Sequence, residues 1–97
     1  MIQSFNDKRT EQVFKNEVPK GFPADLLKRA RHQLKQLNAA NVLEDMKVPP
    51  GNKLHALKGT RRGQHAVCIN DKWRLAFRWK EGNASAVEIT DYHDEKK

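Results

Sequence analysis

Apolar residues recur at helical spacing only in the first half of the chain. The longest such pattern begins after Pro23, whose missing N–H is not needed in the first turn of a helix. Its apolar positions fall within an arc of about 100° on a helical projection; they are Leu26, Leu27, Ala30, Leu34 and Leu37. A shorter helix over residues 7–15 is predicted from the capping side chain of Asn6 or Asp7.

The second half of the chain changes to the two-residue period of β-strands. In residues 73–79 every second side chain is apolar, and those between them are Arg74, Ala76 and Arg78. This alternation predicts a half-buried strand with one polar face. Shorter patterns predict three further strands, at residues 54–57, 64–69 and 84–92. Residues 48–51, VPPG, form a connector whose paired prolines are expected to exclude both helix and interior strand.

These elements predict an α+β fold in which helices pack on one face of an antiparallel β-sheet. The other face is expected to stay solvated and to present Arg74 and Arg78. A chain of 97 residues supports one hydrophobic core, so residues 1–97 are expected to form a single domain.

The positive charge of the chain is concentrated in one segment. The formal net charge is +7, and residues 51–80 hold eight basic side chains and one acidic side chain. Residues 1–50 have a net charge of +3, and residues 81–97 have a net charge of −3. A concentrated positive field favours polyanionic partners such as nucleic acids.

Other features of the sequence indicate the cellular compartment and whether a metal or cofactor is expected. The single cysteine, Cys68, excludes an internal disulfide and indicates a reducing compartment; its place in a predicted strand favours the core. There is no run of eighteen apolar residues and no pattern of a signal peptide, so a cytoplasmic protein without membrane contact is expected. Metal-ligand pairs, a phosphate-binding loop and a dinucleotide-binding glycine pattern are missing, so neither a metal nor a cofactor is expected.

Two histidines are candidates for proton transfer. His93 ends the tripeptide Asp91-Tyr92-His93, whose first two residues close the last predicted strand, and His55 lies in the first strand after the prolines. Imidazole exchanges protons near neutral pH, and a phenol can donate a hydrogen bond or stack on a base. Alone, each of these is more often an ordinary surface or packed residue. Combined with the nearby cations, they suit RNA cleavage without a metal.

The runs PPGNKLHALKG, GQHAVCINDKWRLAFRW and AVEITDYH resemble the HigB toxins of the RelE toxin superfamily. The resemblance spans nearly the whole chain. It implies a compact, RelE-like fold with N-terminal helices on one face of a twisted antiparallel sheet. It also implies a bacterial, ribosome-dependent mRNA endonuclease.

The resemblance further implies a site. The family's catalytic positions correspond to His55, Asp91, Tyr92 and His93. Its basic residues near the scissile phosphate correspond to Lys58 and Arg74. Three more RNA-binding candidates follow from charge and position alone: Arg61, Arg62 and Arg78.

The implied partners are a HigA-type helix-turn-helix antitoxin and mRNA in the A site of the 30S ribosomal subunit. Operator DNA would be reached only through the antitoxin, because the chain has no helix-turn-helix that we can identify. Two alternatives stay open. One is a non-catalytic basic module that binds RNA or the ribosome, and the other is a chain that acts mainly as a regulatory partner of the antitoxin.

Overall fold

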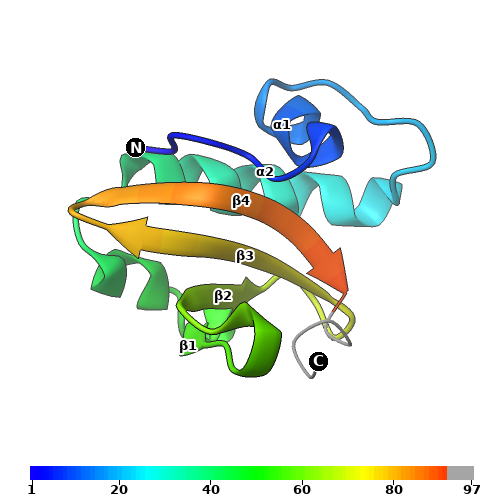
Figure 1. Ribbon diagram of the computed structural model, residues 1–97. Helices are drawn as coiled ribbons and strands as arrows, with labels where there is room; N and C mark the ends of the chain where they lie inside the picture. The colour runs from blue at the N-terminus through cyan, green and yellow to red at the C-terminus, as the bar shows by residue number, and fades with distance from the viewer. Residues whose placement is uncertain (92–97) are drawn as a thin grey trace.

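Two α-helices and four strands are present in residues 1–91, the part of the chain that the computed structural model describes. The helices are α1, Lys8–Phe14, and α2, Ala24–Ala39. The strands are β1, His55–Ala56, β2, Gln64–Cys68, β3, Trp73–Lys80, and β4, Asn83–Asp91. They form one antiparallel sheet in the order β1-β2-β3-β4, and α2 lies along one of its faces (Figure 1). The predicted α+β fold is confirmed.

The hydrophobic core lies between α2 and this face of the sheet. The apolar side of the helix is buried as predicted at Leu26, Ala30, Leu34 and Leu37, whereas Leu27 is half-buried at the margin. The strands contribute Val67, Leu75, Phe77, Val87 and Ile89. Burying a large apolar side chain contributes about 1.5–3 kcal/mol, so this contact determines which face of the sheet turns inward.

The N-terminal segment lies along the free edge of β4. Ile2 and Phe5 form isolated parallel bridges to Ala84 and Val87, respectively. A free strand edge exposes unpaired N–H and C=O groups that other chains could bind. The N-terminal segment therefore covers this edge without adding a regular fifth strand.

Helix α1 is fixed at its first turn. The Asp7 carboxylate caps the helix by accepting a hydrogen bond from the Thr10 N–H at 2.8 Å. Of the two predicted capping residues, Asn6 and Asp7, the structure therefore uses Asp7. The hydroxyl of Thr10 is buried and accepts from the N–H of Ile89 at 2.9 Å. One side chain thus connects the start of α1 to β4.

Two short 3-10 turns, Leu43–Lys47 and Pro50–Asn52, connect α2 to β1. The paired prolines do not exclude helical structure as expected, because the second turn begins at a proline. Proline fits the first position of a helical turn, where its missing N–H has no partner to lose. The connector is therefore a turn that packs on the domain, not an extended spacer.

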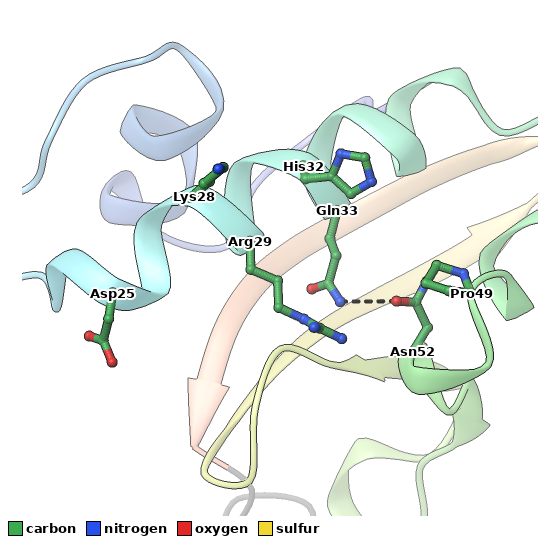
Figure 2. Close-up of a pocket in the computed structure, with 7 residues that line it drawn as sticks. All are labelled: Asp25, Lys28, Arg29, His32, Gln33, Pro49 and Asn52. Atoms are coloured by element: carbon green, nitrogen blue, oxygen red, sulfur yellow. Dashed lines mark hydrogen bonds between the residues drawn. The ribbon is translucent and has the colours of Figure 1, made fainter.

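Buried amide side chains tie α2 to this turn and to β2. Gln33 donates from Nε2 to the carbonyl of Cys68 at 2.8 Å and to Oδ1 of Asn52 at 3.2 Å (Figure 2). Asn52 donates from Nδ2 to the carbonyls of Met46 and Val48 at 3.0 and 3.2 Å. Both amide side chains belong to residues that are only 1% exposed. The amide network thus gives donors to the carbonyls of Cys68 and Met46, whereas Oε1 of Gln33 is buried without a hydrogen-bond partner within residues 1–91. The network fixes the chain just before β1.

The face of the sheet that turns away from α2 is not fully solvated as expected. Ala66 of β2 and Ala76 of β3 are completely buried on this face, where they cluster with Leu57. After β1 the chain crosses the sheet here and makes a 3-10 turn at Gly59–Arg61. We call residues 57–63 the covering loop. Small alanine side chains leave room for it, so the loop closes over the middle of the sheet.

Replacing Asn52 with alanine should lower the free energy of unfolding by about 2 kcal/mol, because buried carbonyls then lose their donor. Urea denaturation followed by circular dichroism measures the change. Asn41→Ala is the matched control, since Asn41 is exposed and its side chain makes no hydrogen bond within residues 1–91; it should change stability by less than about 0.5 kcal/mol. Equal losses in the two variants would contradict a structural role for the amide network.

Candidate functional site

The register of the sheet decides which candidate residues share a face. Side chains directly opposite each other on antiparallel strands point to the same side. On the side away from α2, one row across the four strands consists of His55, Ala66, Ala76 and Glu88. The rows on either side of it are Cys68, Arg74 and Thr90, and Gln64, Arg78 and Ser85. We call this side the outer face; it holds His55, Arg74 and Arg78 together.

His55 is half-buried on the outer face, and its ring is oriented by the backbone. Its Nδ1 lies 2.7 Å from the carbonyl oxygen of Lys53. Because a carbonyl oxygen can only accept, this hydrogen bond requires a proton on Nδ1. The basic nitrogen of the neutral ring is then Nε2. The imidazole is thus held in one tautomer, which suits a residue that transfers protons.

Arg74 lies beside the turn between β2 and β3. Its Nη1 donates to the carbonyls of Asn70 and Trp73 at 2.5 and 3.1 Å. The residue also borders a surface hollow together with Lys53. A guanidinium is planar and suits two-point contact with a phosphate group, so its orientation at this hollow is compatible with RNA binding.

The covering loop is fixed to the outer face through Arg61. Its Nη1 donates to Oε1 of Glu88 at 2.6 Å and to Oε1 of Gln64 at 3.0 Å, and its Nη2 donates to Oγ1 of Thr90 at 3.4 Å. The side chains of Arg61 and Glu88 are 17% and 18% exposed, so water screens this ion pair only in part. The position of Arg61 therefore favours a structural role over the RNA contact expected from its charge.

Three other candidate cations are exposed on or beside the covering loop: Lys58, Arg62 and Arg78. A Cβ at Gly63 would lie 3.0 Å from Nη1 of Arg78, and Gly63 has a φ of +94°. Glycine alone adopts this φ readily and leaves space for the arginine. The loop and β3 can therefore bring these cations to the same side of the sheet as His55.

The C-terminal tripeptide lies only partly within the described residues. Asp91 ends β4 opposite Trp73, so it points to the side of α2 rather than to the outer face. Its Oδ2 lies 4.0 Å from Nζ of Lys72, a pair with an exposed lysine. Tyr92 and His93 lie outside the described residues. The catalytic roles expected for this tripeptide stay predictions.

The other two histidines of residues 1–91 do not join His55. The register places His65 on the side of α2, where its ring centroid lies 6.4 Å from that of Phe77. His32 is exposed on α2. Cys68, expected in the core, is half-buried and belongs to the outer face.

Residues 1–91 contain neither a cluster of metal ligands nor a helix that could cross a membrane. No three His, Cys, Asp or Glu side chains in this range gather closely enough to hold a metal ion. No helix in the same range combines the length and the apolar character that crossing a membrane requires.

Sequence reasoning missed two residues that shape the site. Glu88 lies between the buried residues Val87 and Ile89, so its place on the polar side of β4 follows from strand alternation. Its ion pair with Arg61 does not follow, because the two residues are 27 positions apart and a loop joins them in space. Lys53 orients the ring of His55 through its backbone carbonyl. A backbone contact of this kind leaves no signal in the pattern of side chains.

The sequence matches a family of known toxins. A family model described as the RelE-like toxin of the type II toxin-antitoxin system HigB matches residues 3–93. The chain belongs to this family. This HigB-like toxin is 31% identical to Endoribonuclease HigB of Proteus vulgaris over 93 residues, which cover 96% of this chain and 100% of the relative. It is 30% identical to Toxin HigB-1 of Vibrio cholerae serotype O1 over 98 residues, with coverage of 100% and 99%.

Solved structures agree with the fold. A mutant of YafQ from E. coli superposes with a TM-score of 0.64 at 13% identity, covering 97% of this chain and 94% of that chain. YafQ from E. coli strain BL21(DE3) gives a TM-score of 0.56 at 14% identity, with the same coverage. The family model and the two relatives confirm the resemblance to HigB toxins. As a toxin of a type II system, the HigB-like toxin has an antitoxin as its partner.

Breaking the pair of Arg61 and Glu88 should loosen the covering loop. Arg61→Ala is expected to lower the free energy of unfolding by about 1–3 kcal/mol, because it leaves a partly buried carboxylate without its cation. A double-mutant cycle with Glu88→Gln, measured by urea denaturation, should give a coupling energy of about 1 kcal/mol.

Arg62→Ala is the control for this cycle, because Arg62 is the exposed neighbour in the same loop. We expect it to change stability by less than about 0.5 kcal/mol and to show no coupling to Glu88. Additive effects of the Arg61 and Glu88 substitutions would show that the ion pair does not hold the loop.

Proposed function

We propose that this HigB-like toxin is an endoribonuclease that cleaves mRNA on the ribosome and thereby stops translation and growth. The observation that carries the proposal is His55, an imidazole oriented in one tautomer on a sheet face that also holds Arg74 and Arg78. The name of the Proteus vulgaris relative, Endoribonuclease HigB, supports the same activity. The net charge of +7 suits a polyanionic substrate.

The proposed reaction uses the RNA's own 2′-hydroxyl as the nucleophile. The 2′-oxygen forms a bond to the adjacent phosphorus while the bond from phosphorus to the 5′-oxygen breaks. One side chain accepts the proton of the 2′-hydroxyl, and another donates a proton to the leaving 5′-oxygen. The products are a 2′,3′-cyclic phosphate and a 5′-hydroxyl, so the step balances without water or a cofactor.

His55 and His93 share the acid and base roles in this mechanism. The hydrogen bond between Nδ1 of His55 and the Lys53 carbonyl supports Nε2 as the nitrogen through which His55 exchanges its proton. His93 of the predicted tripeptide takes the complementary role. Each proton transfer of this kind typically accelerates a reaction by about 10²–10⁴-fold.

The remaining candidates serve binding and charge stabilisation. Lys58 and Arg74 stabilise the negative charge that develops on the phosphoryl oxygens. Tyr92 stacks on or orients a base of the substrate, and Asp91 orients a neighbouring side chain. The exposed positions of Arg62 and Arg78 support contacts with the RNA backbone.

The proposal extends to the partners. We expect the antitoxin to be of the HigA type, with a helix-turn-helix that gives the complex its access to operator DNA. The substrate is mRNA in the A site of the 30S subunit, and the reaction takes place in the cytoplasm.

A non-catalytic RNA- or ribosome-binding module is the second candidate. Within residues 1–91 the outer face carries one histidine, whereas acid–base cleavage needs two groups that transfer protons. The cations of the outer face would serve binding equally well. The two candidates therefore differ in whether the message is cut.

Primer extension on a message translated by purified ribosomes distinguishes an endoribonuclease from a module that only binds. The wild type should cut the message with and without EDTA. His55→Ala and His93→Ala should each reduce the cleavage rate by at least about 10²-fold, because each removes a proton-transfer group. Lys35→Ala is the control and should cleave at the wild-type rate, since Lys35 is exposed on α2 and does not belong to the outer face.

Circular dichroism of each variant shows whether loss of cleavage reflects loss of folding. Ribosome binding by the wild type without any cleavage product would favour the binding module. Growth arrest and cleavage by both the His55 and His93 variants would refute their assigned roles.

A further inference from the structure

Arg29 of α2 borders a surface hollow next to the proposed catalytic histidine. The hollow has a volume of about 340 Å³ and lies between α2 and the turn that joins β2 to β3. Among residues 1–91, its cations are Arg29, Lys53 and Arg74, and its one carboxylate is that of Asp71. The hollow thus has an excess of positive charge and receives it from three separate segments of the chain.

The side chain of Arg29 reaches this hollow from the helix. Figure 2 shows it extended away from α2 toward the turn that contains Asn52. A Cβ at Gly51 would lie 3.6 Å from Nη2 of Arg29, so the guanidinium rests against the backbone there. Arg29 is exposed, and within residues 1–91 its side chain makes no hydrogen bond or ion pair. Its charge is therefore available to a ligand.

The hollow adjoins the site through the backbone of Lys53. This residue lines the hollow, and its carbonyl holds the ring of His55 at 2.7 Å. Arg74, which lines the same hollow, belongs to the outer face. A strand of RNA that passes His55 and Arg74 would therefore meet Arg29 next.

A second hollow continues the cationic surface beyond Arg29. It has a volume of about 390 Å³, and its basic and imidazole side chains are Arg29, Lys28 and His32 (Figure 2). Asp25 is its one carboxylate among residues 1–91. Arg29 belongs to both hollows, so it is the link between the outer face and α2.

We propose that Arg29 binds a backbone phosphate of the substrate RNA in the hollow that it shares with Lys53 and Arg74. The interface then extends from the outer face of the sheet onto α2. This inference rests on the proposed function, since it assigns a further contact to the same substrate. Single-stranded RNA is the ligand that fits, because its phosphates repeat along a flexible chain and can follow cations from sheet to helix.

The test compares Arg29→Ala with Lys35→Ala in the full chain. Lys35 is an exposed cation on the same helix that borders neither of these two hollows. Binding to a single-stranded RNA oligonucleotide is measured by fluorescence anisotropy over a series of salt concentrations. Arg29→Ala should weaken binding by about fivefold at low salt. It should also make the slope of log K against log salt shallower by about 0.7, the value for one lost phosphate contact on a single strand. Lys35→Ala should keep the wild-type slope.

Several outcomes would overturn the assignment. Equal slopes for wild type and Arg29→Ala show that Arg29 touches no phosphate. An equal change in the two variants shows an effect of net charge only. Weaker binding of Arg29→Ala to ribosomes without mRNA, but not to the oligonucleotide, assigns the contact to ribosomal RNA instead of the substrate. Weaker binding of this variant to the antitoxin alone assigns the hollow to an acidic protein segment.

Cleavage by the wild type, measured separately, keeps the two proposals distinct. If the wild type cuts a translated message and Arg29→Ala has an unchanged salt slope, the inference about Arg29 fails and the proposed function stands. If the wild type binds RNA without cutting a translated message, the proposed function fails whatever the slope.

Discussion

The pairing of β3 with its two neighbours determines which side chains lie on the outer face. Successive side chains of a strand point to opposite faces, so a shift of one residue would exchange the two faces completely. In the observed register Leu75 and Phe77 are fully buried against α2, and Arg74 and Arg78 belong to the outer face. Exposing those two apolar side chains would cost about 1.5–3 kcal/mol each. The hydrophobic core thus places the cations, although no cation contributes to it.

The ion pair that holds the covering loop reduces the repulsion between basic side chains on the outer face. Residues 51–80 hold eight basic side chains, and like charges that are brought together by folding repel each other. Glu88 provides a carboxylate among them and binds Arg61 at 2.6 Å. Leu57 packs on the two buried alanines at the other end of the loop. An apolar contact and an ion pair therefore hold the loop in place, and Lys58 and Arg62 stay exposed.

The parts of the structure that depend on local periodicity could be predicted from the sequence. The buried side of α2 and the alternation of β3 follow from repeats of 3.6 and two residues, because burial acts on each segment separately. The covering loop could not be predicted from the sequence, because the apolar run around Leu57 is too short to show which face of the sheet Leu57 covers. The role of Arg61 was missed for a different reason, because its carboxylate partner lies 27 residues away. The charge of a side chain is visible in a sequence, but the group that neutralises it is visible only in the fold.

Helix α2 shows that the core and the proposed RNA interface are parts of one arrangement. Arg29 and Gln33 are four residues apart, so they lie on the same side of the helix. Gln33 is buried and bonded to Asn52 and to the carbonyl of Cys68, which holds this stretch of helix against the turn and β2. The same contact brings Arg29 over Gly51, one residue before Asn52. A cation on a freely placed helix would lose side-chain and rigid-body freedom on binding RNA. Here the buried amides have already fixed the helix relative to the sheet, so the loss that remains is that of the arginine side chain alone.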